Sequence, residues 1–417
     1  MKPIRTLAMG AALAMSITQA SAAEIEVLHW WTSGGEAKAA NMLKQKLEAQ
    51  GHTWKDFAVA GGGGDSAMTV LKSRAISGNP PAVAQIKGPL IQEWGEMGFL
   101  GNIDQVAQEE NWNELLTPQL AAYNKVDGHY ASVPVNIHRI NWLWANPDVL
   151  EKAGIDALPK TWDEFFADAE KIREAGFIPL AHGGQPWQDA TVFETVLMGV
   201  GGPEFYRKAF VELDPEALTS DTMIESLKTF KKLRTTMDPN IAGRDWNVAT
   251  SMVINGKAAM QIMGDWAKGE FTAAGLKPGE DYLCEAVPMT DNMFSYNVDS
   301  FAMFKVDDEA KKQAQMDLAS LILSPEFQSS FNQAKGSIPV RLDVPLDGFD
   351  ACAKASRKAF DAASEKNGLV PSLAHGMAVP ASVQGAVFDV ITNYFNDPEM
   401  TAEAAAEQLA SAVRAAG

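Results

Sequence analysis

Short β-type runs alternate with amphipathic helical segments in the first part of the chain, and this order restricts the fold more than any other feature. The runs at 24–30, 55–59 and 82–86 predict strands, while the segments at 36–49 and 66–77 predict helices. A βαβαβ order favours an open, mostly parallel sheet with helices packed against its faces. We therefore expect an α/β fold, in which a ligand binds beyond the carboxyl ends of strands.

The N-terminus has the pattern of a secretory signal peptide. Lys2 and Arg5 precede an apolar run over 7–17, and the small residues at 20–22 form a cleavage site. The apolar run is shorter than the roughly 20 residues that a membrane-spanning helix needs. We expect residues 1–22 to be removed and the mature protein to be released into the periplasm. No cysteine stands at the cleavage site, so we expect no lipid anchor.

The size and charge of the chain limit its domain organisation and its partners. A chain of 417 residues is longer than one ordinary domain, so two domains are expected. A net charge of −18 argues against binding to nucleic acid or to an anionic membrane. The two cysteines, Cys284 and Cys352, either form one disulfide or remain buried thiols.

Motifs for catalysis and for cofactors are incomplete in this sequence. The glycine tract at 61–64 fails the dinucleotide fingerprint and is better explained as a strand-to-helix turn capped by Asp65 or Ser66. The histidines form no HExxH pair, and two distant cysteines do not make a zinc site, so no metal or cofactor is expected. A secreted glycosidase needs only two carboxylates and remains the enzyme alternative.

Four motifs follow one another along the chain and carry a family resemblance. They are GNPP at 78–81, LPKTWDEF at 158–165, NGKAAMQIMGDW at 255–266, and SPEF at 324–327 leading to GSIPVR at 336–341. On these motifs the mature chain resembles the extracellular solute-binding proteins of carbohydrate ABC transporters, and their glucose-binding branch most closely. The resemblance implies a binding protein and not an enzyme.

The resemblance also implies a two-lobed periplasmic binding protein fold, of the Venus-flytrap type, with the ligand in the cleft. The chain would cross between the lobes three times, near Pro134, Asp299 and Pro339. The N-terminal lobe would then comprise 23–134 and 300–338, and the C-terminal lobe 135–299 and 339–417. Both cysteines would fall in the second lobe, so that a disulfide would leave the hinge free.

The ligand implied by the resemblance is a monosaccharide, with glucose preferred, and the partner is a membrane permease that accepts the sugar from a monomeric protein. A pyranose offers apolar C–H faces and a rim of hydroxyls, which suit aromatic rings and charged or amide side chains. The alternatives are another monosaccharide or a short oligosaccharide, a peptide, an osmolyte such as betaine, or the glycosidase named above. Cationic lining would disfavour a quaternary ammonium ligand.

The candidate ligand-binding residues lie in predicted loops and at strand ends, and each has a structural alternative. One of the two adjacent tryptophans can belong to the core. Glu36 completes a capping box with Ser33, and Lys87 resembles a solvated surface lysine. Asp299, at a predicted crossing, can instead be a buried ion-pair partner. The predicted set is Trp30, Trp31, Glu36, Gln85, Lys87, Trp246, Trp266, Asp299, Lys335 and His375.

Overall fold

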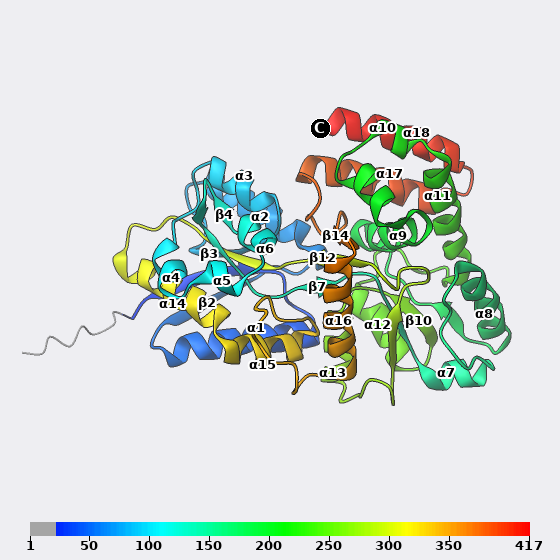
Figure 1. The fold of residues 1–417 in the computed structure, drawn as a ribbon, viewed down its shortest axis with the longest axis horizontal. Helices are drawn as coiled ribbons and strands as arrows, with labels where there is room; N and C mark the ends of the chain where they lie inside the picture. The colour runs from blue at the N-terminus through cyan, green and yellow to red at the C-terminus, as the bar shows by residue number, and fades with distance from the viewer. Residues whose placement is uncertain (1–21) are drawn as a thin grey trace, which may run out of the picture.

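A computed structural model describes residues 22–417 and contains two lobes (Figure 1). Lobe 1 is built on a five-stranded sheet with the order β2-β1-β3-β13-β6. The three strands predicted at the start of the chain are parallel neighbours, which confirms the βαβαβ prediction. The strands are β1 (Glu24–His29), β2 (Thr53–Ala58), β3 (Val83–Ile86), β6 (Ser132–Pro134) and β13 (Ser300–Met303).

Helices cover the sheet of lobe 1 and bury regularly spaced apolar side chains. Helix α1 (Gly34–Ala49) buries Ala39, Leu43 and Leu47, which lie one helical turn apart on one face. The helix after the glycine tract, α2 (Asp65–Ile76), likewise buries Ala67, Leu71 and Ala75. The other helices are α3 (Leu90–Glu96), α4 (Asp104–Glu109), α5 (Trp112–Leu115), α6 (Pro118–Tyr123), α14 (Glu309–Leu323) and α15 (Pro325–Lys335); a short hairpin pairs β4 (Lys125–Val126) with β5 (His129–Tyr130).

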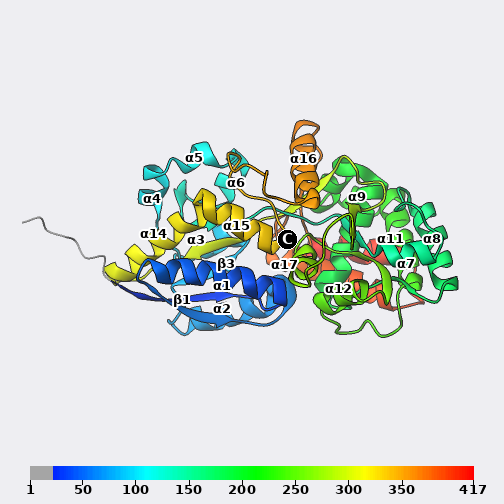
Figure 2. The same ribbon diagram turned by 90° about the horizontal axis from the view of Figure 1, so that it is seen from below.

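Lobe 2 is built on a four-stranded sheet with the order β11-β8-β10-β9. Its strands are β8 (Trp142–Ala145), β9 (Ile178–Leu180), β10 (Ala258–Ile262) and β11 (Leu283–Ala286). The helices around it are α7 (Pro147–Lys152), α8 (Trp162–Glu174), α9 (Pro186–Phe210), α10 (Pro215–Leu218), α11 (Asp221–Leu233), α12 (Trp246–Ile254), α13 (Ala267–Ala273), α16 (Ala351–Glu365), α17 (Ala381–Asn396) and α18 (Ala402–Ala416). In Figure 2, α7, α8, α9, α11 and α12 lie at the end of the molecule away from the sheet of lobe 1, and α16 stands near the middle.

Three chain segments run side by side between the lobes, as the crossing prediction requires. The backbone N–H of Val135 donates to the carbonyl of Asp299 at 2.8 Å, and that of Ile137 donates to Ile338 at 2.9 Å. Just beyond them, a small sheet joins β7 (His138–Arg139), β12 (Phe294–Asn297) and β14 (Leu369–Pro371). The two-lobed fold with three crossings is thus confirmed, and the hinge segments are held to one another by backbone hydrogen bonds.

Helices α8 and α15 begin at capping side chains, whereas the caps that the sequence offers for α1 and α2 are absent. Thr161 forms a full capping box with Glu164, and Ser324 caps α15. Ser33 makes no side-chain cap to α1, and the carboxylate of Glu36 accepts from Lys335 and not from the cap amide. Asp65 and Ser66 lie inside α2, whose N-cap is Gly64 in the left-handed conformation.

The two cysteines form a disulfide that links α16 to β11 in lobe 2. The Cα atoms of Cys284 and Cys352 lie 6.1 Å apart. The predicted signal peptide, apart from its last residue, lies outside the described residues. Within residues 22–417, no helix combines the length and the apolar character needed to cross a membrane.

Candidate functional site

A small cavity between the lobes, which we call the inner cavity, brings together nine of the ten predicted ligand-binding residues. Residues from lobe 1, from the crossing segments and from lobe 2 all contribute to its wall. Its free volume is about 30 Å³. The lining residues are Trp30, Trp31, Glu36, Gly62, Gly63, Lys87, His138, Trp187, Trp246, Trp266, Asn297, Asp299, Lys335 and His375.

Tryptophan rings form the apolar part of the wall. Both members of the Trp30–Trp31 pair line the cavity, although Trp31 is only 2% exposed and also packs against Phe301 and Phe331 in the core of lobe 1. From lobe 2, Trp266 lies with its ring centroid 4.8 Å from that of His375. Flat apolar faces therefore approach the cavity from both lobes.

The predicted residues Glu36 and Lys335 form a buried ion pair at the cavity wall. The Nζ atom of Lys335 donates to Oε1 of Glu36 at 2.9 Å, and both side chains are largely buried. The same ammonium lies 5.6 Å from the ring centroid of Trp31. This arrangement places a fixed carboxylate and a fixed ammonium beside an aromatic face, which provides both acceptors and donors for a hydroxylated ligand.

Asp299 belongs to a charged cluster at the crossing segments. His138 contacts the carboxylate of Asp265 through Nδ1 and that of Asp299 through Nε2, the latter at 3.2 Å. Burial alone would raise the pKa of Asp299, but the hydrogen bond and charge of His138, with Lys335 and Lys87, hold it well below its usual range. Burial lowers the pKa of His138, yet the two carboxylates outweigh burial and leave it raised. The cluster therefore favours an imidazolium between two carboxylates.

Lys87 differs from the other cations of the cavity. Its Nζ donates to the carbonyl of Gly63 at 3.2 Å and lies 5.0 Å from the ring centroid of Trp30. Burial lowers its pKa, and the negative charges of Asp299 and Asp65 oppose that effect. Pairing reduces the cationic lining that the sequence predicts, because Lys335 has the carboxylate of Glu36 as its partner. Among the described residues lining the cavity, Lys87 is the lysine outside any ion pair.

The loop at 372–376 holds His375 in the site through a buried carboxylate. Glu194 in α9 accepts hydrogen bonds from the hydroxyl of Ser372 at 2.7 Å and from the backbone N–H of Ala374 at 3.1 Å. Tyr206 donates to the same carboxylate at 2.9 Å. Burial raises the pKa of Glu194 to about 7. Burial also lowers the pKa of His375 well below its usual value, so its imidazole is neutral and pairs with Thr191.

Gln85 is the predicted residue that does not line the cavity. It is fully buried, and its side-chain amide donates to Asp299 at 3.1 Å while its oxygen accepts from the backbone N–H of Trp30 at 3.3 Å. Gln85 thus lies behind the cavity wall, and its hydrogen bonds hold Trp30 and Asp299, which both line the cavity.

Five lining residues are absent from the predicted set. Asn297 lies two positions before the predicted Asp299, and His138 lies four positions after the predicted crossing at Pro134, but no sequence signal singled out either residue. Trp187 follows the loop after β9 and opens α9, so the rule of searching strand-to-helix loops would have found it. Gly62 and Gly63 allow the backbone of lobe 1 to approach the ring of Trp187 in the opposite lobe. A Cβ atom on Gly62 would lie 2.6 Å from that ring.

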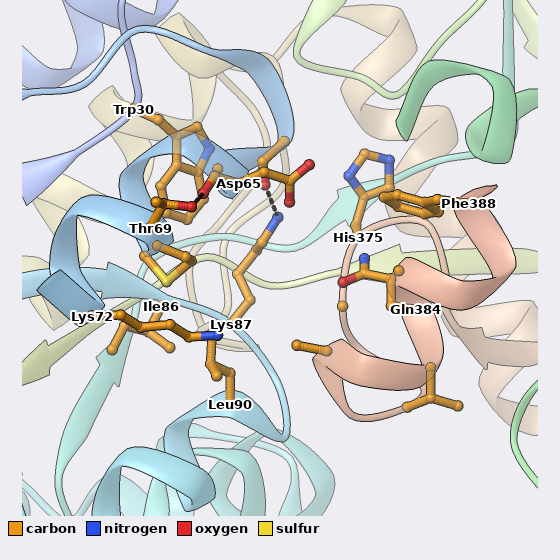
Figure 3. A pocket seen from close by; sticks show the side chains of 17 residues that line it. Trp30, Asp65, Thr69, Lys72, Ile86, Lys87, Leu90, His375, Gln384 and Phe388 are labelled. Atoms are coloured by element: carbon orange, nitrogen blue, oxygen red, sulfur yellow. Dashed lines mark hydrogen bonds between the residues drawn. The ribbon is translucent and has the colours of Figure 1, made fainter. Parts of the chain in front are cut away.

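A second, larger hollow adjoins the inner cavity, and we call it the outer chamber. Its volume is about 270 Å³, and it shares Trp30, Gly63, Lys87 and His375 with the inner cavity. In Figure 3, Asp65, Thr69 and Lys87 of lobe 1 face His375, Gln384 and Phe388 of lobe 2 across this space.

Comparison with known proteins places the chain in a family. Residues 31–328 match the family model described as bacterial extracellular solute-binding protein. The chain is 51% identical over 392 residues to a probable sugar-binding periplasmic protein of Brucella melitensis biotype 1, covering 94% of this chain and 92% of the relative. It is 48% identical over 417 residues to a probable sugar-binding periplasmic protein of Rhizobium meliloti, covering both chains completely.

Solved structures agree at the level of the fold. A chitin oligosaccharide binding protein superposes with a TM-score of 0.81 at 19% identity, covering 95% of this chain and 99% of the other. The solute receptor AcbH, described as preferring β-D-galactopyranose, superposes with a TM-score of 0.80 at 17% identity, with the same coverage of 95% and 99%. The protein belongs to the bacterial extracellular solute-binding protein family.

Proposed function

We propose that this protein is the periplasmic sugar-binding component of an ABC importer. The observation that carries the proposal is the inner cavity, where tryptophan rings from both lobes surround fixed carboxylates, ammonium groups and amides. Apolar faces with a polar rim match the surface of a pyranose. The names of the Brucella and Rhizobium relatives support the same ligand class.

The proposed mechanism is closure of the two lobes around the sugar. A ligand that contacts both lobes stabilises the closed arrangement by its differential affinity for that arrangement, and periplasmic binding proteins are a standing example of such hinge closure. The free volume of about 30 Å³ is room for roughly two water molecules. Sugar entry therefore requires the lobes to separate or the tryptophan rings to move.

The ligand proposed for the inner cavity is a monosaccharide, with glucose preferred on the resemblance of the sequence. Direct contacts are assigned to the nine predicted residues that line the cavity, and Gln85 supports Trp30 and Asp299 from behind. We further propose that 23–134 with 300–338, and 135–299 with 339–417, move as the two lobes. The protein would act as a monomer after removal of residues 1–22, and the permease would recognise its closed form.

Titration calorimetry tests the ligand class. The full mature protein is titrated with glucose, galactose, mannose and betaine, and the Trp266→Ala variant is treated identically. We expect one-to-one binding of a monosaccharide, weakened by about tenfold or more in the variant because an aromatic face is lost. Binding of betaine without binding of any sugar would replace the sugar proposal with an osmolyte binder. Hydrolysis of an aryl glycoside would point to the glycosidase.

A further inference from the structure

Asn297 has a side-chain oxygen that the protein itself leaves without a hydrogen bond. The residue is 3% exposed, and no donor within residues 22–417 reaches its Oδ1 atom. Other buried polar atoms of this kind occur in the described part of the chain, but they belong to residues that line neither the inner cavity nor the outer chamber. Asn297 alone among them lies in the wall of the inner cavity.

The backbone fixes the place of Asn297. Strand β12 is the middle strand of the small sheet between the lobes, and Asn297 lies opposite His138 of β7. Side chains alternate between the two faces of a strand. The flanking residues Tyr296 and Val298 belong to the hydrophobic core of lobe 1, whereas Asn297 lines the cavity. The amide is therefore held beside the cavity before a ligand arrives.

The neighbouring acceptors of the wall differ from Asn297 because they already serve protein donors. The carboxylate of Asp299 accepts from the amide of Gln85 at 3.1 Å, and that of Glu36 accepts from Lys335 at 2.9 Å. Both are charged groups, whereas the amide of Asn297 is neutral and carries an acceptor and a donor. Its oxygen can be satisfied by a ligand that brings a donor, as a sugar hydroxyl does.

An unpartnered amide at this position costs the fold free energy. A buried acceptor without a donor has lost its hydrogen bonds to water and gained none in return. Leucine is similar in size to asparagine and would avoid that cost, and apolar neighbours such as Val298 would accept it. The stability of the fold therefore gives no reason for an amide at position 297, whereas a bound hydroxyl does.

We propose that Asn297 is a specificity-determining residue, whose Oδ1 atom accepts a hydrogen bond from one particular hydroxyl of the bound monosaccharide. A sugar that lacks this hydroxyl leaves the amide buried and unpaired in the closed form and is rejected for that reason. The proposal rests on the proposed function, because it places a monosaccharide in the inner cavity. It adds the residue that selects among sugars of the same size.

The test compares a parent sugar with its deoxy forms. The full mature protein and Asn297→Leu are titrated with glucose, galactose and mannose, and then with the forms of the tightest-binding sugar that lack the hydroxyl on carbon 2, 3, 4 or 6. We expect Asn297→Leu to bind the parent sugar about tenfold or more weakly than the wild type does. In the wild type one deoxy sugar should bind about tenfold or more weakly than the parent, and in Asn297→Leu the two should bind within about twofold of each other.

Ser295→Ala is the matched control. Ser295 is buried in the same strand and does not line the cavity, so this variant should keep the affinities of the wild type within about twofold. The melting temperature of the ligand-free protein separates a ligand contact from a structural role. Ligand-free Asn297→Leu should melt at or above the wild-type temperature, because an unpartnered amide is replaced by an apolar group. Asn297→Ala, which adds no bulk, repeats the test if leucine prevents folding.

The outcomes separate this inference from the proposed function. If the Asn297 variants bind the parent sugar and its deoxy forms as the wild type does, the role of Asn297 is contradicted and the proposed function stands. If they lose affinity but keep the wild-type order among the deoxy sugars, or if both melt well below the wild type, Asn297 has a structural role and the inference fails. If glucose, galactose and mannose all fail to bind the wild type, the proposed function itself fails.

Discussion

The carboxylate of Glu270 in α13 of lobe 2 accepts a hydrogen bond from the backbone N–H of Gly35 in the first turn of α1 of lobe 1, at 2.9 Å. The contact occupies the helix N-terminus that Ser33 leaves uncapped. The two helices meet at glycines, because a Cβ atom on Gly35 would lie 2.7 Å from the carbonyl carbon of Gly269. A carboxylate at a helix N-terminus is stabilising, and here the stabilisation exists only while the lobes are together.

Removal of Glu270 is expected to favour the open arrangement. Glu270→Ala should weaken sugar binding by about threefold to tenfold, since a cap contributes roughly 1 kcal/mol, and should leave the order of preference among sugars unchanged. Small-angle X-ray scattering of the ligand-free variant should show a larger radius of gyration than the wild type. Glu280→Ala, at an exposed surface pair with Lys277, is the control and should change neither quantity. Unchanged affinity and scattering in Glu270→Ala would contradict the role of this contact in closure.

Substitution of His138 is expected to destabilise the hinge cluster. His138→Gln removes the imidazolium and leaves the buried carboxylates of Asp265 and Asp299 without it. The free energy of unfolding should fall by roughly 3–5 kcal/mol. The pKa of His138 is raised in the folded state, so its contribution is complete below the unfolded value of 6.5 and is lost as pH rises through the folded value. The urea midpoint should therefore fall most at pH 6 and less at alkaline pH.

The exposed pair of His129 and Asp104 provides a control for this prediction. His129→Gln removes an imidazole that is mostly solvent-exposed, so the urea midpoint should change little at any pH. An equal and small effect of the two substitutions would show that the hinge cluster carries no special stability.

Glu194 should make the protein less stable as pH rises. Its pKa is 4.5 in an unfolded chain and is raised to about 7 by burial, so the folded state binds more protons between these values. The difference corresponds to up to roughly 3 kcal/mol of unfolding free energy lost on going from pH 4.5 to 7. In Glu194→Gln this loss should disappear. The exposed Glu225→Gln is the control and should keep the wild-type pH profile. If Glu194→Gln kept the pH profile of the wild type, Glu194 would not be the cause of the loss of stability.

The disulfide should stabilise lobe 2 without affecting binding. Its cysteines are separated by 68 residues in sequence, and a loop of that length is expected to contribute about 4 kcal/mol by the chain-entropy model. Cys284→Ser with Cys352→Ser should lower the melting temperature and leave the sugar dissociation constant unchanged, because neither residue lines the cavity. A large loss of affinity in the double variant would show that the bond shapes the site.

The start of the first sheet was predictable because its signals are local and periodic: alternating strands and helices predicted parallel strands. The two lobes and the crossings near Pro134, Asp299 and Pro339 were implied by the family resemblance instead. Cap residues were less predictable. The capping partner of Thr161 is Glu164, within one helical turn, whereas the partner of Glu36 is Lys335, almost 300 positions away. Competition from a distant partner leaves no trace in the local sequence.

The site was predictable where residues stand in strand-end loops, as Trp30, Lys87 and Trp266 do. Gly62 was missed because the reason for it is the indole of Trp187 in the other lobe, whereas Trp187 itself follows a strand-to-helix loop that the search rule covers. The ion pairs of the site were not predictable from the sequence. Sequence gives the charges of Lys335 and His138, but only the structure pairs them with Glu36, Asp265 and Asp299.

The measurement that tests the central claim most directly is glucose calorimetry on substitutions from each side of the cleft. Lys87→Met removes a donor of lobe 1, and Trp246→Ala removes an aromatic wall of lobe 2. If one sugar is held between the lobes, each variant should lose about tenfold or more in affinity while the stoichiometry stays at one. Loss in only one of the two variants would place the ligand on a single lobe and contradict capture by closure.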